Sequence, residues 1–170
     1  MGEKNEKKPE NAGLETATFA AGCFWGVEEF FRELPGVVST MVGYTGGKMK
    51  NPSYEDVCTD ETGHAEAVQI VFDPSKIAYE KLLKIFWGNH NPTTMNRQGP
   101  DTGAQYRSAI FYHSEEQKKL AEKSKEGLEK SGKFASPIVT QIVPAQEFFK
   151  AEDYHQKYYF KRGIKAMCHI

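Results

Sequence analysis

The sequence predicts an α/β (α+β) fold: a single domain built as a two-layer sandwich, with helices packed on a mixed sheet. Segments with the apolar or alternating pattern of strands are interleaved along the chain with segments of helical periodicity, and helices placed in this way cover a mixed sheet. The 170 residues, 39% of them hydrophobic, suffice for one domain with a substantial core. Since the chain has no internal repeat and no low-complexity block, we expect one domain only.

Charge and hydropathy exclude several classes of protein. Lysine plus arginine (22) nearly balance aspartate plus glutamate (23), so nothing indicates a nucleic-acid or acidic-membrane partner. No apolar run approaches the ~20 residues that span a bilayer, and the charged residues 1–11 are not a secretory signal. We therefore expect a cytoplasmic protein and, because no apolar helical stripe is left over after packing, a monomer. The predicted division is a flexible tail over residues 1–14, a folded domain over 15–162 and a C-terminal tail over 163–170.

The N-terminal half of the domain is predicted as strand, helix, strand and strand. An apolar run at residues 17–21 has the pattern of a buried strand. Apolar side chains spaced i, i+3, i+4 and i+7 from Val27 predict an amphipathic helix, which a proline-glycine pair ends. Residues 37–44 predict a second strand before a glycine-rich loop, and residues 65–72 predict a third. Between them, residues 54–58 fit either a short strand or one helical turn.

The middle of the chain is predicted as helix, loop and strand. Residues 75–89 predict a helix whose single apolar stripe fits core packing. Residues 88–104 predict an irregular loop, and a loop of this length inside a compact domain is usually functional or mobile. Residues 105–112 predict a strand that places Tyr106 and Tyr112 on one face.

The last part of the domain is predicted as helix, strand and helix. The sequence Ser114-Glu115-Glu116-Gln117 matches a capping box and opens a charged helix that Gly132 ends. Residues 138–143 predict a strand before a proline, and residues 145–162 predict a final helix.

Cys23 lies where the first strand gives way to the first helix, within the first helical turn. Unpaired backbone N–H groups and the helix dipole favour an anion there, and this placement can lower a cysteine pKa from its free value of about 8.5. Phe24 and Trp25 beside it offer apolar ring surface to a bound molecule. The pattern predicts a nucleophilic cysteine with an aromatic pocket; the alternative from these residues alone is an inert buried cysteine.

Glu66 is in phase with three large apolar side chains of its strand, those of Val68, Ile70 and Phe72. If that face is buried, desolvation raises the pKa of the Glu66 carboxyl and keeps it protonated as an acid. The alternative is that Glu66 lies at a frayed strand end in water.

The cysteines at positions 23, 58 and 168 are an odd number without close paired spacing. They match neither a secreted disulfide framework nor the ligand pattern of structural zinc, so we expect no bound metal. Cys58 is expected to be a buried packing residue. An attack by a thiol on a weakly electrophilic centre whose oxygen must leave needs proton donors, and a protonated carboxyl group and phenol hydroxyls suit that role.

Five motifs, in this order, resemble those of the A-type peptide methionine sulfoxide reductases, and the similarity runs from about Thr16 to the C-terminus. The motifs are Gly22-Cys23-Phe24-Trp25-Gly26, Gly43-Tyr44-Thr45-Gly46-Gly47, Asn51-Pro52-Ser53-Tyr54, Thr62-Gly63-His64-Ala65-Glu66-Ala67-Val68 and Gln105-Tyr106-Arg107-Ser108.

The resemblance implies reduction of the S epimer of methionine sulfoxide, free or in proteins; one reductase class serves each epimer. Cys23 then matches the nucleophile that attacks the sulfoxide sulfur. Phe24 and Trp25 match the pocket for the S-methyl group.

The same resemblance implies four polar residues around the sulfoxide oxygen. Glu66 matches the acid that protonates this oxygen, and Tyr54 and Tyr106 match the hydroxyls that hydrogen-bond it. Asp101 matches an aspartate of the same polar wall.

The resemblance also implies a redox cycle without a bound cofactor. Cys23 becomes a sulfenic acid, a second thiol condenses with it to a disulfide, and external thioredoxin (or dithiothreitol) resets the enzyme. Cys168 matches the resolving cysteine, because Cys168-His169-Ile170 resembles an ending found in part of the family, although Ala166-Met167 precedes it where the family has Gly-Tyr.

Two other functions are kept as alternatives. One is a cysteine hydrolase in which His64 or His155 serves Cys23 as general base. The other is a non-catalytic domain that holds exposed methionines on the Phe24-Trp25 patch.

Overall fold

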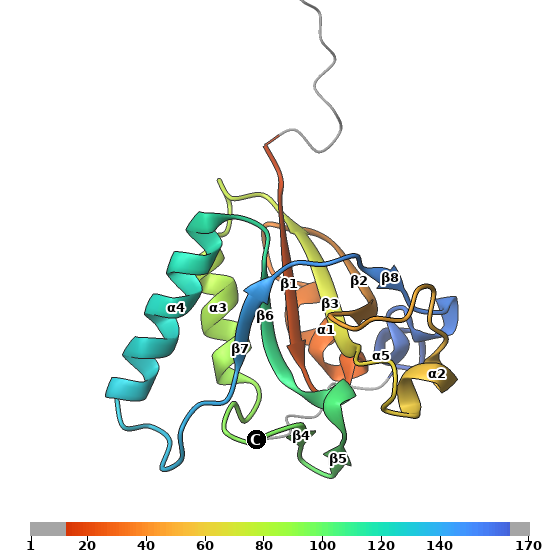
Figure 1. The fold of residues 1–170 in the computed structure, drawn as a ribbon. Helices are drawn as coiled ribbons and strands as arrows, with labels where there is room; N and C mark the ends of the chain where they lie inside the picture. Colours follow the sequence, from red (N-terminus) through yellow and green to blue (C-terminus); the bar gives the residue numbers. More distant parts are fainter. Residues whose placement is uncertain (1–12, 164–170) are drawn as a thin grey trace, which may run out of the picture.

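The computed structural model describes residues 13–163, and their architecture is a six-stranded sheet with helices packed on it (Figure 1). The strand order is β7-β6-β1-β3-β2-β8. All neighbours are antiparallel except β6 and β7, which are parallel, so the sheet is mixed, as predicted. The predicted fold class is confirmed.

The sheet strands are β1 (Glu15–Ala21), β2 (Val37–Thr45), β3 (Ala65–Phe72), β6 (Ser108–Tyr112), β7 (Gln141–Pro144) and β8 (Phe149–Lys150). A separate pair is formed by β4 (Arg97–Gln98) and β5 (Asp101–Thr102). The helices are α1 (Phe24–Arg32), α2 (Tyr54–Cys58), α3 (Tyr79–Gly88), α4 (Glu115–Lys130) and α5 (Tyr158–Lys161), with 3₁₀ turns η1 (Ala104–Tyr106) and η2 (Asp153–His155). No helix within residues 13–163 is long and apolar enough to cross a membrane.

The main core lies between α1, α3 and α4 and one face of the central strands. It includes Phe19 of β1 and the β3 side chains Val68, Ile70 and Phe72, none of which is exposed to solvent. The opposite face carries four buried alanines and Phe111, against which the segment that contains Phe148 packs. Figure 1 shows α3 and α4 together beside the sheet, and β8, α5 and α2 at its other end.

The C-terminal segment departs furthest from the sequence-based prediction: a single helix over residues 145–162 is wrong. The chain instead forms β8, η2 and the short α5. Backbone N–H groups of this segment bind other elements, since Ala151 donates to the Val42 carbonyl (3.0 Å) and Lys157 donates to the Glu28 carboxylate (2.6 Å). Helix propensities differ by less than about 1 kcal/mol per residue, so such tertiary bonds decide the local structure.

Two smaller differences, and one choice between alternatives, concern shorter segments. Residues 54–58 are not a difference but a choice: they form a helix, the second of the two structures that the sequence allowed. The predicted loop over 88–104 contains the β4-β5 pair. Tyr106 lies in η1 and not in a strand, so it does not share a strand face with Tyr112.

Candidate active site

Cys23 is the N-cap residue of α1, at the junction with β1, as predicted. The preceding residue must be glycine. Gly22 has a φ of +98°, and a Cβ atom there would lie 2.8 Å from the Gln98 side chain. This close approach brings the β4-β5 pair, which carries Asp101 opposite Gln98, against the start of α1.

The pKa of the Cys23 thiol is the opposite of what its position at the helix start predicted. Burial raises this pKa to about 12, and the nearby carboxylates of Glu66 and Asp101 raise it further. The backbone N–H groups of Trp25 and Gly26 do favour the thiolate, but their contribution is smaller than the cost of desolvation. The resting thiol is therefore protonated at neutral pH, and the predicted lowering of its pKa is wrong.

Glu66 lies on the core-facing side of β3 and is 2% exposed, so the predicted apolar environment is confirmed and a solvated position is excluded. Its carboxyl group accepts hydrogen bonds from the Phe24 backbone N–H (3.2 Å) and the Gln105 side-chain amide (3.5 Å). Burial nevertheless raises the Glu66 pKa to about 8, because it outweighs these two hydrogen bonds, and the charge of Asp101 adds to the rise. The carboxyl group is largely protonated at pH 7 and can donate a proton.

Tyr54 and Tyr106 are half-buried at the edge of the same site, at the start of α2 and in η1. Burial is the main cause that raises the pKa of each phenol, and the Glu66 charge contributes to both. Both hydroxyl groups therefore stay neutral at pH 7 and keep the proton that a hydrogen-bond donor needs. The charge of Asp101 acts on Cys23, Glu66 and Tyr106. The structure thus gathers all five polar residues that were selected from the described part of the sequence.

The two aromatic residues next to Cys23 differ in accessibility. Phe24 is 1% exposed, with its ring against those of Tyr44 and His155. Trp25 is half-buried, so it keeps ring surface that a ligand can reach. Its indole stacks on Tyr158, with ring centroids 3.7 Å apart and an interplanar angle of 4°.

Sequence reasoning missed how the C-terminal segment surrounds the site, and it considered His155 only as a general base. The His155 ring accepts a hydrogen bond from the Trp25 indole N–H, with a distance of 2.9 Å between Trp25 Nε1 and His155 Nδ1. Burial raises the pKa of Tyr159, and the charges of Cys23 and Asp101 raise it too, so its hydroxyl group lies near the same site. The dense aromatic run from 154 to 160 was the available signal, but its assignment to one helix concealed which of these rings converge.

The other two cysteines lie in different situations. Cys168 lies outside the described residues. Cys58, at the end of α2, is exposed and not a buried packing residue, so that prediction is wrong. Its sulfur accepts a hydrogen bond from the Gln105 side-chain amide at 3.6 Å, and the same amide reaches Glu66.

The histidines proposed for a hydrolase are committed to other bonds. His64 Nδ1 accepts a hydrogen bond from the Gly47 backbone N–H, which leaves Nε2–H to donate to the Met49 carbonyl oxygen at 2.6 Å. No hydrogen bond joins either His64 or His155 to Cys23 in the part of the chain that the structure describes. Within residues 13–163, no cluster of three histidine, cysteine or acidic side chains could hold a metal ion.

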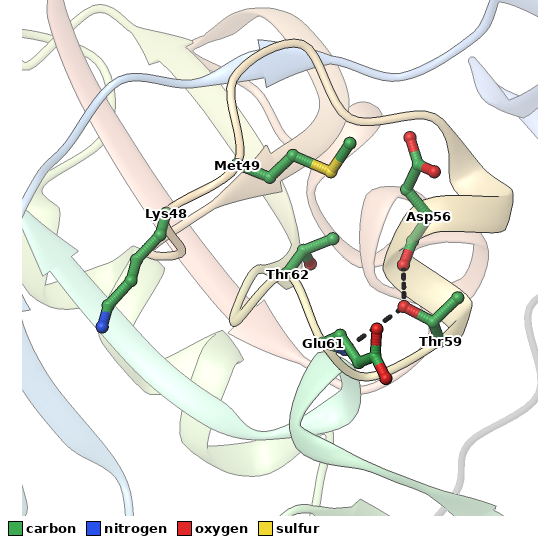
Figure 2. Close-up of a pocket in the computed structure, with 6 residues that line it drawn as sticks. All are labelled: Lys48, Met49, Asp56, Thr59, Glu61 and Thr62. Atoms are coloured by element: carbon green, nitrogen blue, oxygen red, sulfur yellow. Dashed lines mark hydrogen bonds between the residues drawn. The ribbon is translucent and has the colours of Figure 1, made fainter.

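A hollow of about 470 Å³ lies between α2 and the loops around it (Figure 2). Part of its wall is a turn in which the Thr59 hydroxyl donates to the Asp56 carbonyl (2.6 Å) and accepts from the Glu61 backbone N–H (3.3 Å). None of its lining residues is one of the predicted catalytic or substrate-binding residues. The residues predicted to carry the chemistry therefore lie outside the lining of this hollow.

Comparison with known proteins points to one family. A family model described as peptide methionine sulfoxide reductase matches residues 15–170. Peptide methionine sulfoxide reductase MsrA of Methanosarcina mazei is 64% identical over 152 residues, which cover 89% of this chain and 72% of the relative.

Solved structures agree with the sequence comparison. Reduced Mxr1 from Saccharomyces cerevisiae superimposes with a TM-score of 0.82 at 38% identity, covering 97% of this chain and 94% of that one. Mxr1 in complex with Trx2 gives a TM-score of 0.60 at 28% identity, covering 91% of each chain.

Proposed function

Because the chain belongs to the peptide methionine sulfoxide reductase family, we propose that it reduces the S epimer of methionine sulfoxide, free or in proteins, at Cys23. The observation that carries this assignment is the pairing of a thiol at a helix start with a buried carboxyl group whose pKa is about 8. A carboxylic acid that is protonated at neutral pH can donate to an oxygen that must leave.

In the first step, Glu66 donates its proton to the sulfoxide oxygen while the Cys23 sulfur attacks the sulfoxide sulfur. The net change is one thiol plus one sulfoxide giving one sulfenic acid plus one thioether, so the Cys23 sulfur is oxidised and the substrate sulfur is reduced by two electrons. The thiol proton of Cys23 replaces the proton that Glu66 has donated, so no proton is gained or lost overall. When Glu66 is neutral, its charge no longer disfavours the Cys23 thiolate. The protonation states of Cys23 and Glu66 are therefore coupled.

The remaining site residues bind and orient the substrate. Tyr54 and Tyr106 donate hydrogen bonds to the sulfoxide oxygen, and Asp101 completes the polar wall. Trp25 forms the accessible side of the S-methyl pocket, and Phe24 supports it from the core; the half-buried position of the Trp25 ring supports this role.

In the second step, the Cys168 thiol condenses with the Cys23 sulfenic acid, giving a disulfide and water. Thioredoxin, or dithiothreitol in the laboratory, then supplies two electrons and two protons that restore both thiols. The solved complex of the similar protein Mxr1 with Trx2 supports thioredoxin as the physiological reductant.

We further propose that the enzyme acts as a monomer in the cytoplasm and uses no bound metal or organic cofactor. The three cysteines are an odd number and lack the paired spacing of a disulfide framework, which supports a reducing compartment. An external dithiol is the only reductant that the thiol chemistry needs.

The test measures reduction of dabsylated S-methionine sulfoxide with thioredoxin or dithiothreitol. Cys23→Ser abolishes reduction, whereas Cys168→Ser allows one stoichiometric reduction and blocks thioredoxin-coupled turnover. Cys58→Ser is the matched control and retains full turnover. If the Cys58→Ser enzyme instead loses thioredoxin-coupled turnover and the Cys168→Ser enzyme keeps it, the resolving cysteine is Cys58. Failure of the intact protein to reduce the sulfoxide would leave a methionine-binding domain as the better account.

A further inference from the structure

We propose that His155 is a positioning residue that holds the Trp25 indole in place and thereby sets the size of the S-methyl pocket. This inference rests on the proposed function, in which Trp25 forms one side of that pocket. The two side chains are 130 positions apart in sequence and are joined by the hydrogen bond from Trp25 Nε1 to His155 Nδ1, at 2.9 Å.

The chemistry of the two rings assigns the proton in this bond. An indole N–H can only donate, so Nδ1 must be the unprotonated, accepting nitrogen of His155. The imidazole is completely buried, and this burial lowers its pKa, while the charge of Glu152 acts in the opposite direction. The neutral ring that the bond requires is thus the form that its surroundings favour.

The hydrogen bond adds a restraint that stacking does not supply. Trp25 lies parallel to Tyr158 (4°), which defines the plane of the indole but restrains its rotation within that plane only weakly. A bond from one edge atom of the indole to a fixed acceptor restrains this rotation. The outer edge of Trp25, which meets the substrate, is therefore placed by His155.

His155 itself is fixed independently of Trp25. Its ring packs against Phe24 (5.1 Å between centroids), Tyr54 (4.6 Å) and Tyr154 (4.0 Å). Its neighbours in the chain are hydrogen-bonded to other elements. The Glu152 carboxylate accepts from Tyr44 and Tyr54, and the side-chain amide of Gln156 bonds to both backbone groups of Val42. The Lys157 backbone N–H donates to the Glu28 carboxylate. Because three elements hold this short segment, the indole adapts to His155.

Packing alone does not require a histidine at this position. With Nδ1 accepting from Trp25, the proton is on Nε2, which is buried and has no hydrogen-bond partner within residues 13–163. An unpaired buried donor is unfavourable, and phenylalanine would fill a similar volume without one. What histidine provides beyond phenylalanine is the acceptor for the Trp25 N–H.

The first test compares His155→Phe, which keeps an aromatic ring without the acceptor, with His155→Asn, whose side-chain oxygen can take the place of Nδ1. His155→Phe lowers kcat/KM for the methyl sulfoxide about threefold to tenfold, the range expected for one net hydrogen bond. The loss appears mainly in KM, and selectivity for methyl over ethyl sulfoxide falls with it. His155→Asn restores both. Ile110→Val, a buried core change on β6, controls for general destabilisation and alters neither.

The second test observes the hydrogen bond directly. The chain has two tryptophans, so Trp87→Phe leaves Trp25 as the only source of an indole N–H signal in a nitrogen-proton correlation spectrum. In this background the signal is shifted downfield and exchanges slowly with solvent. His155→Phe shifts it upfield and speeds the exchange, and His155→Asn reverses the change. The Trp87→Phe protein alone suffices if His155→Phe does not fold. The inference is overturned if the Trp25 indole N–H of the Trp87→Phe protein exchanges with solvent as fast as that of free indole.

The outcomes separate this inference from the proposed function. If Trp25→Phe leaves methyl-to-ethyl selectivity unchanged, the pocket assignment fails. If Trp25→Phe alters selectivity but His155→Phe does not, the pocket stands and the positioning role is overturned. The positioning role is also overturned if His155→Asn is as impaired as His155→Phe, because the acceptor would then not matter.

Discussion

Replacing Glu66 by glutamine removes the buried titratable carboxyl group and keeps nearly the same shape. The glutamine oxygen can still accept from the Phe24 backbone N–H, and the Gln105 amide must turn over to accept from the new amide. The change therefore isolates the proton of Glu66 from its packing.

The effect on catalysis follows from the role of Glu66 as a general acid. Such a group contributes about 10²–10⁴ in rate, so we expect kcat for the sulfoxide to fall at least about 100-fold. In the wild-type enzyme, kcat should decline as pH rises through about 8, because the carboxyl group then ionises. The Glu66→Gln enzyme should lack this decline. Single-turnover reduction measured from pH 6 to 10 checks both expectations.

The effect on stability has a definite sign. The pKa of Glu66 is about 8 in the folded chain and 4.5 ordinarily, so the folded state binds more protons between these values. Stability from this group is fully present below pH 4.5 and is lost as pH rises through 8, with a slope of about 1.4 kcal/mol per pH unit. Between pH 5 and 8, wild type should lose about 4 kcal/mol relative to Glu66→Gln.

Urea unfolding of both proteins at pH 5, 6, 7 and 8 measures this difference. A stability difference that stays constant across this range would refute the buried-acid argument. So would a Glu66→Gln enzyme with unchanged single-turnover rates, since the proton donor would then lie elsewhere.

Two further predictions concern the start of α1. Because burial raises the Cys23 pKa to about 12, iodoacetamide should modify Cys23 more slowly than the exposed Cys58 at pH 7. Mass spectrometry of the two cysteine-containing peptides measures both rates. Faster labelling of Cys23 would contradict a protonated resting thiol. Gly22→Ala should destabilise the fold by at least about 1–3 kcal/mol in urea unfolding, since its φ is +98° and its new methyl group would lie 2.8 Å from Gln98. A neutral Gly22→Ala variant would mean that the β4-β5 pair moves freely relative to Cys23.

The spacing of apolar residues predicted the local structure correctly wherever an element has one consistently buried face. The phase of β3 placed Glu66 beside Val68, Ile70 and Phe72, and the apolar stripe of α3 is buried as predicted. It failed for residues 145–162, where backbone groups bond to strands and helices far away in sequence. Amino-acid order alone carries no signal for such bonds.

The sequence by itself determined the fold class, the position of Cys23 at a strand-to-helix junction and the apolar surroundings of Glu66, because each depends on residues close together along the chain. Only the tertiary structure decided the protonation state of Cys23 and the environment of Trp25. Desolvation of the thiol comes from surrounding elements and outweighs the N–H groups of its own helix. The acceptor for the Trp25 indole is 130 residues away, and only folding brings it to 2.9 Å.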